Sequence, residues 1–363
     1  MGSVSHSRVD AYLSCKRKEF YGYHKKLTRI ETSVGLALGT SIHRVLQALY
    51  STVLAAGTGL EDQKAAYPDG VKAAWAEVEK IYAEGYEDSD KRAPLRLIIE
   101  KYLQREPFID NDWSGDYRQW RILAVEMEFN LEWDPENEGR YPFVVDLIVQ
   151  DPDGVVAVVD HKGLFDFYSY EATNLMPQIP KYIGALRGLG HTIGYGIYNM
   201  IRTRPDSKGD KLKKADLIAK LREVEPARIE LYEEASGKPL EKALAKDIEI
   251  LAEELGVQFY EGRALDDWAF AMDIQPSGQR VQRSFLEQIV ASQEVAALDE
   301  LDDETRDIKA LRVGNNMICK SCSFKDLCSE ELRGGNVALL MQTDYRIKDK
   351  RDQIEVTTEV EEV

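Results

Sequence analysis

The feature that most constrains this fold is a short turn between two apolar segments. Asp151-Pro152-Asp153-Gly154 separates two runs that are rich in β-branched and aromatic residues. A turn of this composition suits a β-hairpin that is closed by a left-handed glycine. If Asp151 pairs with Val155, the same register places Asp146 opposite Asp160. The sequence therefore predicts an antiparallel strand pair in which two carboxylates face each other.

Facing carboxylates indicate a cation site. Strand periodicity also places Lys162 on the same face as Asp160. Like charges opposed in a sheet destabilise it, and a buried carboxylate is costly unless it is protonated or binds a cation. A divalent ion such as Mg²⁺ or Mn²⁺ would relieve the repulsion and could act in phosphate ester hydrolysis. The alternative is that these residues are solvent-facing strand charges, because single Asp-x-Lys matches are common by chance.

The residues around this hairpin predict a β-β-β-α-β core. We expect three strands, then a helix and a fourth strand, at 121–133, 141–151, 155–162, 177–189 and 192–202. Before them we expect a helix over 8–27, a loop from Gly35 to Gly39, a helix that begins at Thr40 or Ser41, and helix over 70–105. This gives five regions: a helical region 1–120, a core 121–204, a charged helical region 205–315, a cysteine segment 316–335 and a tail 336–363, partly disordered.

Composition limits the possible classes of protein. The chain has 363 residues, of which 44% are hydrophobic and 31% charged, as expected of a globular protein. Its net charge of −17 argues against a nucleic-acid partner, although basic clusters remain at Lys16-Arg17-Lys18 and at Arg202 and Arg204. No stretch reaches the ~18 apolar residues of a membrane span, so we expect a cytoplasmic protein without membrane contact.

The cysteines are few and patterned. Cys319, Cys322 and Cys328 form a C-x2-C-x5-C motif, and the one other cysteine is Cys15 near the N-terminus. In a cytoplasmic chain this spacing favours a metal site over disulfides.

Further motifs resemble those of a known nuclease family in type and order. Gly39-Thr40-Ser41-Ile42-His43 is similar to a G-x-x-x-H motif, and Val145-Asp146 and Asp160-His161-Lys162 are similar to the two acidic motifs, the second being D-x-K. Gln178 and Tyr182 resemble a Q-x-x-x-Y motif on one helix face. These motifs resemble the iron–sulfur, RecB-like members of the PD-(D/E)XK nuclease superfamily, which include the CRISPR-associated exonucleases.

The resemblance implies a fold and a set of roles. The fold would be α/β, a restriction-endonuclease-like mixed sheet flanked by helices. His43, Asp146, Asp160 and the carbonyl of His161 would bind Mg²⁺ or Mn²⁺. The catalytic set would comprise Asp146, Asp160, Lys162, Glu126, Gln178 and Tyr182. The glutamate could be Glu126 or Glu128, and its spacing to Phe129 favours Glu126. Pro177 and Pro180 are compatible with the motif helix if both lie in its first turn.

The resemblance also assigns the cysteines. In relatives of this kind, one N-terminal and three C-terminal cysteines hold a [4Fe–4S] cluster, here Cys15, Cys319, Cys322 and Cys328, which joins the two ends of the chain. Zinc is the alternative metal for four thiolates.

The implied activity is metal-dependent hydrolysis of DNA, by an exonuclease acting on single-stranded ends. Recombination, repair, phage replication and CRISPR spacer acquisition are possible settings. Unwinding would require a partner such as a helicase, because the chain lacks a G-x-x-x-x-G-K-[ST] loop. Two alternatives remain open: a catalytically silent DNA-binding or assembly subunit, and a zinc-stabilised scaffold.

Overall fold

The structure is a computed structural model. It describes residues 4–30, 34–105, 120–134, 139–204, 213–255, 268–314, 316–320 and 322–348, and the statements below concern these residues.

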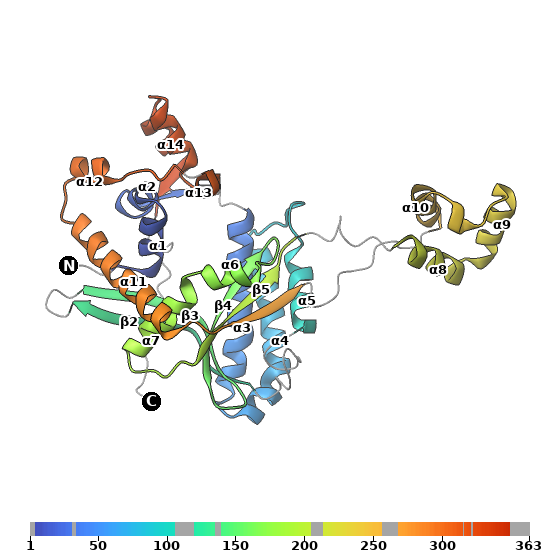
Figure 1. Ribbon diagram of the computed structural model, residues 1–363, viewed down its shortest axis with the longest axis horizontal. Helices are drawn as coiled ribbons and strands as arrows, with labels where there is room; N and C mark the ends of the chain where they lie inside the picture. Colours follow the sequence, from blue (N-terminus) through green and yellow to red (C-terminus); the bar gives the residue numbers. More distant parts are fainter. Residues whose placement is uncertain are drawn as a thin grey trace.

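A five-stranded mixed sheet forms the centre of the fold (Figure 1). Its strands lie in the order β2-β3-β4-β5-β6, and only the β4–β5 pair is parallel. Their bounds are β2 (Arg121–Asp134), β3 (Gly139–Gln150), β4 (Val156–Leu164), β5 (Tyr195–Arg202) and β6 (Ala269–Ile274). The predicted mixed sheet with flanking helices is confirmed.

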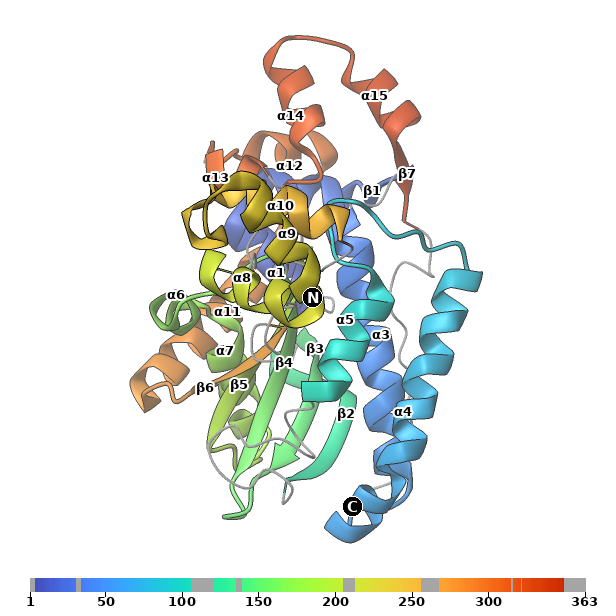
Figure 2. The same cartoon turned by 90° about the vertical axis from the view of Figure 1, so that its right-hand side faces the viewer.

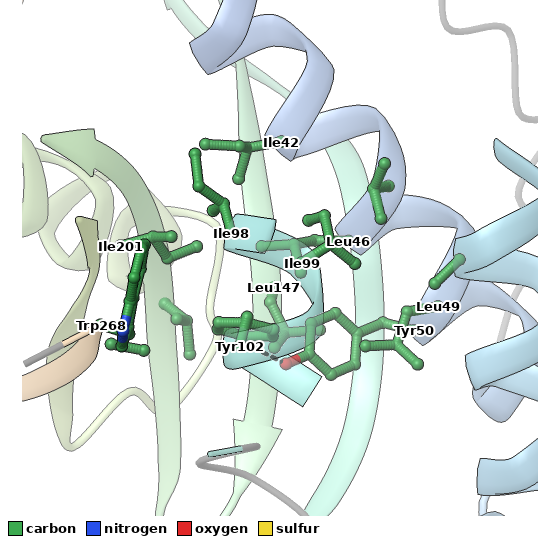
Figure 3. Close-up of a cluster of buried hydrophobic side chains, with 14 of the residues drawn as sticks. Ile42, Leu46, Leu49, Tyr50, Ile98, Ile99, Tyr102, Leu147, Ile201 and Trp268 are labelled. Carbon is green, nitrogen blue, oxygen red and sulfur yellow. Dashed lines mark hydrogen bonds between the residues drawn. The ribbon is translucent and has the colours of Figure 1, made fainter. Parts of the chain in front are cut away.

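Helices cover both faces of the sheet, and each face has its own apolar core (Figure 2). On one face lie α3 (Val34–Ala55), α4 (Leu60–Ala83) and α5 (Leu95–Arg105). Their buried residues include Leu46 and Tyr102, which pack against Leu147 of β3 (Figure 3). On the other face lie α7 (Gln178–Gly188) and α11 (Gly278–Leu298).

The beginning and the end of the described chain pack together. The N-terminal elements are α1 (His6–Ser14), α2 (Lys16–Glu19), the π-helical turn Phe20–His24 and β1 (Leu27–Arg29). The C-terminal elements are α12 (Asp303–Lys309), α13 (Asn316–Lys320), α14 (Lys325–Leu332), α15 (Val337–Asp344) and β7 (Tyr345–Ile347). Strand β1 pairs with β7, and Phe20 and Tyr21 share a small apolar core with Phe324 and Tyr345.

Several helix boundaries differ from the sequence-based expectations. The helix expected over 8–27 breaks at Cys15, whose backbone is extended, with φ −168° and ψ 116°. The expected loop at Gly35–Gly39 is helical, because α3 already begins at Val34 and buries Leu38 in the core. The helix expected over 70–105 is two helices, α4 and α5.

The chain after β5 also differs from expectation. Strand β6, within the region expected to be mostly helical, adds a fifth strand to the sheet beside β5. Between β5 and β6, the helices α8 (Lys214–Val224), α9 (Pro226–Ser236) and α10 (Ala245–Glu254) pack around an apolar core of their own (Figure 1). Residues 336–348, assigned above to the tail, form α15 and β7, while 349–363 lie outside the described residues.

None of the described helices is both long enough and apolar enough to cross a membrane.

A buried ion-pair network holds the two ends together. Arg306 of α12 is 2% exposed, and its guanidinium lies 2.9 Å from Glu19 Oε1 and 2.6 Å from Asp299 Oδ1. Arg8 of α1 contacts the same two carboxylates at 2.8 and 2.6 Å. Because Glu19 is also almost fully buried, its charge depends on both arginines for compensation.

We expect Arg306→Ala to lower the free energy of unfolding by about 3 kcal/mol, because it removes one of the two cations that compensate the buried Glu19. The measurement is the urea concentration at the midpoint of unfolding, with the dependence of the unfolding free energy on urea unchanged. Arg283→Ala is the matched control, since Arg283 pairs only with Glu287 on the surface of α11, and it should cost less than about 0.5 kcal/mol. Equal midpoints for the two variants would contradict a stabilising role of the network.

Candidate active site

Helix α3 brings His43 onto the sheet beside β4. Gly163 of β4 faces this helix closely, because a Cβ there would lie 3.3 Å from Ile42 Cδ1, whereas a Cβ on Gly39 would meet nothing within 4 Å. The side chain of His43, one turn after Gly39, then reaches the strand, and its Nε2 lies 3.0 Å from the carbonyl oxygen of His161. This contact places the histidine of the G-x-x-x-H motif beside the D-x-K strand.

The hairpin of β3 and β4 has the predicted register. Pairs run from Gln150↔Val156 to Leu147↔Val159, and Gly154 closes the turn with φ 82°. The paired ladder stops one residue before Asp146 would meet Asp160. There Asp146 Oδ2 accepts a hydrogen bond of 2.8 Å from the backbone N–H of His161. The predicted register is confirmed, and the strands separate where the carboxylates lie.

Strands β2 and β3 change face together beside this point. The pair Val125↔Leu147 packs in the core under α3, whereas the pair Met127↔Val145 packs in the core under α7. The residue between these pairs on β2 is Glu126, whose φ of 47° is left-handed and unusual for a residue other than glycine. Such strain is typical of functional sites, where the surroundings hold it in place.

This kink gathers three potential metal ligands. One ligand atom each from His43, Glu126 and Asp146 lies within 4.8 Å of the others. His43 Nδ1 is 3.5 Å from Asp146 Oδ2 and 3.8 Å from Glu126 Oε1. Glu128, the alternative glutamate, is exposed and pairs with Val144, so the geometry favours Glu126 as the site residue.

The charges in this group are unbalanced. Burial acts to lower the pKa of His43, but the adjacent carboxylates of Glu126, Asp146 and Asp160 outweigh burial and raise the pKa to about 9. Burial, together with Glu126, raises the pKa of Asp146 despite the opposing effect of His43. One imidazolium thus shares a small volume with several carboxylates, which is the condition that a cation relieves.

Asp160 and Lys162 form the second half of the site. Asp160 is 1% exposed, and its Oδ2 lies 2.6 Å from Lys162 Nζ. Burial outweighs this pairing and raises the pKa of Asp160 to about 6. Burial also opposes the charge of Lys162, but Asp160 beside it is stronger, so the pKa of Lys162 is raised. Lys162 is therefore a protonated amine at neutral pH.

Helix α7 continues the contacts of Lys162. Lys162 Nζ donates to Gln178 Oε1 at 2.8 Å, and Gln178 Nε2 donates to the hydroxyl of Tyr182 at 2.8 Å. The helix begins at Gln178, with Pro177 as its N-cap and Pro180 as its third residue, so both prolines lie where a helix tolerates them. The Q-x-x-x-Y residues thus support the D-x-K lysine.

The ring of His161 packs in the core under α3, with its centroid 6.0 Å from that of the His43 ring in an edge contact. It stacks on Tyr50 at 5.9 Å, and Asn199 Nδ2 donates to its Nδ1 at 2.9 Å. Asn199 also donates to the hydroxyl of Tyr102 at 2.9 Å. Burial holds the pKa of His161 well below its usual range, so the ring is neutral.

Sequence reasoning did not identify this ring support. Its signal was a single amide, Asn199, in an otherwise apolar strand. By fixing the ring, Asn199 and Tyr50 orient the backbone of His161, whose N–H and C=O contact Asp146 and His43.

The donor set fits a hard divalent cation. Two carboxylates and one imidazole nitrogen are ligands compatible with Mg²⁺ or Mn²⁺. The carbonyl of His161, which was also expected to be a ligand, instead contacts Nε2 of His43, whereas Nδ1 faces the carboxylates. Asp160 lies beside this group and is engaged with Lys162.

The four cysteines are not gathered in the same way. Cys15 lies at the break between α1 and α2, Cys319 in α13, and Cys322 and Cys328 before and within α14. All four are among the described residues, and their sulfur atoms do not form a ligand group of the kind found at His43. The expectation that a metal cluster joins the two ends is thus not supported here, where the ion pairs of Arg306 and Arg8 join them.

We expect Mn²⁺ to raise the thermal midpoint of the protein through the site of His43, Glu126 and Asp146. At a free metal concentration 100 times Kd, binding to the folded state alone stabilises it by about 2.7 kcal/mol. Asp146→Asn should lose most of this shift. Asp153→Asn, in the exposed hairpin turn, is the control that should retain it. A shift that is the same in both variants would place the metal elsewhere.

Comparison with known proteins gives one result at the level of family. No curated protein matches the chain. The model of the PD-(D/E)XK nuclease superfamily, however, matches residues 3–329, which include the sheet, the candidate active site and all four cysteines. Because this match covers most of the sequence, the chain belongs to the PD-(D/E)XK nuclease superfamily.

Proposed function

We propose that this protein is a Mg²⁺- or Mn²⁺-dependent deoxyribonuclease that degrades DNA from single-stranded ends. Membership of a nuclease superfamily supports phosphodiester hydrolysis as the reaction. The observation that carries the proposal is the group of His43, Glu126 and Asp146, held beside the buried Asp160–Lys162 pair.

The residues divide the chemistry between them. His43, Glu126 and Asp146 would hold the metal, with Asp160 completing the acidic set and the carbonyl of His161 orienting the His43 ring through Nε2. When bound, such an ion supplies Lewis-acid stabilisation of the phosphodiester under attack by water. Lys162, protonated and held by Gln178, can donate hydrogen bonds to a phosphate oxygen and stabilise the charge that develops on it.

The finer features rest on the resemblance to RecB-like nucleases. These features are exonucleolytic attack from an end, a preference for single-stranded DNA, and a helicase or recombination partner. The alternative is a catalytically silent DNA-binding or assembly subunit, and the net charge of −17, which argues against nucleic-acid binding, favours the assembly role within it. The presence of every motif residue, with Lys162 placed between Asp160 and Gln178, favours the enzyme.

We expect Asp160→Ala to abolish metal-dependent degradation of end-labelled single-stranded DNA, because it removes a site carboxylate and the partner of Lys162. The loss should be at least about a hundredfold, in line with the removal of one charged catalytic group. Asp153→Ala, in the exposed turn of the same hairpin, should retain the activity of the wild type. If the wild type degrades no DNA with either metal, the silent-subunit alternative is favoured.

We further propose that Cys15, Cys319, Cys322 and Cys328 bind a [4Fe–4S] cluster, with Zn²⁺ as the alternative. Burial raises the pKa of the Cys328 thiol against the opposing effect of Arg312, and Cys322 and Cys15 add to the increase. Both Cys322 and Cys328 also border the apolar core that unites the chain ends.

The metal at the cysteines is distinguished by its absorbance. Anaerobically purified protein with a cluster should have a broad band near ~400 nm, from charge transfer between thiolate and iron. Cys322→Ser should lose this band. A colourless protein with bound zinc would favour the alternative, and a protein with neither metal would contradict both.

A further inference from the structure

The four most exposed aromatic side chains that the structure describes all lie in one region. Phe165 and Tyr168 are 43% exposed and Tyr170 is 57% exposed, and all three lie between β4 and the first residue of α6 (Tyr170–Leu175). Phe270 of β6, which is 38% exposed, meets the same segment through Phe167, whose ring lies 6.1 Å from its own. We call Phe165, Phe167, Tyr168, Tyr170 and Phe270 the aromatic patch.

Three arginines are interleaved with these rings. The guanidinium of Arg92 lies 4.8 Å from the ring centroid of Phe165, and that of Arg204 lies 5.6 Å from it. The guanidinium of Arg202 lies 4.3 Å from the ring of Phe167. Arg202 and Arg204 also contact Asp166, at 3.3 and 3.1 Å, so three guanidinium groups gather beside these rings.

This surface adjoins the candidate active site directly. It begins three residues after Lys162 on β4 and precedes Gln178, the residue that contacts Lys162 from α7. Tyr168 is close enough to Lys162 to contribute to its raised pKa. A ligand that lies on the aromatic patch can therefore extend to the lysine and the carboxylates.

The chemistry of the patch selects one kind of ligand. Exposed rings leave apolar surface in contact with water unless another planar group covers them. Nucleic-acid bases can cover such rings by stacking on them. Arginines beside the rings pair with phosphates, and they are positive in a chain whose net charge is −17. In a duplex the base faces are already stacked, so this surface matches unpaired bases.

We propose that the aromatic patch and its arginines bind single-stranded nucleic acid, stacking unpaired bases and leading the backbone to Lys162. This deepens the proposed function and rests on it for the role of the bound strand. The rings that would distinguish single-stranded from double-stranded nucleic acid lie outside the metal site.

The test is equilibrium binding of fluorescein-labelled oligothymidylate to the full chain in EDTA, where hydrolysis cannot proceed without metal. Phe165→Ala combined with Tyr170→Ala should weaken binding at least about tenfold, because stacking on each ring contributes on this scale. Tyr168 is left in place because it also affects Lys162. Leu286→Ala with Val290→Ala, two exposed apolar residues of α11, is the control and should bind as the wild type does.

An abasic strand of equal length separates stacking from charge, since it carries the phosphates without the bases. We expect wild type and double variant to bind it alike. Arg204→Ala should instead reduce the salt dependence of binding, by about 0.7 in log–log slope for one phosphate contact, whereas Arg283→Ala should not.

The outcomes separate the two proposals. If the wild type hydrolyses DNA but the double variant binds and degrades strands as well as the wild type does, the patch proposal is wrong and the nuclease proposal stands. If strand binding depends on the rings but no metal supports hydrolysis, the patch stands and the nuclease proposal fails. The patch proposal is also wrong if the double variant loses duplex binding and single-strand binding equally, or if the wild type does not bind single strands at all.

Discussion

The site depends on one hydrogen bond, from the backbone N–H of His161 to the side chain of Asp146. At this point β3 stops pairing with β4 through its backbone, while β4 continues beside β5 as far as Leu164. The carboxylate thus takes the place of a ladder carbonyl and satisfies an amide that would otherwise lack a partner. Where this pairing ends, the side chains of Asp146 and Glu126 from the sheet meet that of His43 from α3.

Two apolar cores make this arrangement tolerable. Repelling carboxylates and a left-handed glutamate destabilise the fold locally, and they persist only where the surroundings fix them. Here the sheet is covered on both faces, and the kink of β2 and β3 lies where the strands change from one core to the other. His161 connects the site to the core, because its backbone contacts His43 and its neutral ring packs against Tyr50. The strain is therefore confined to a few residues between rigid layers.

The sequence allowed the central strands and the hairpin register to be predicted, because the turn residues at Asp151 and Gly154 fix the pairing over a short distance. Motif spacing likewise identified the residues that surround Lys162. The features that could not be predicted from the sequence depend on packing between distant parts of the chain. Leu38 extends α3 through two glycines because it is buried in the core, and β6 becomes a strand because the edge of β5 is available to it. The hydrogen bond from Asn199 to the ring of His161 also could not be predicted, because it joins residues of two strands that are far apart in the sequence.

The helical group inserted between β5 and β6 has a consequence for the order in which the chain is completed during synthesis. Strand β5 leaves the ribosome well before β6, and until Ala269–Ile274 emerge, its outer edge has no neighbour from β6. The intervening helices α8, α9 and α10 have their own apolar core, so they can fold as a unit during this delay and bring their two ends together. The N-terminal helices wait longer still, because the partners of Arg8 and Glu19 follow only at Asp299 and Arg306. During synthesis all strands of the central sheet are therefore present before the partners that join the two ends of the chain.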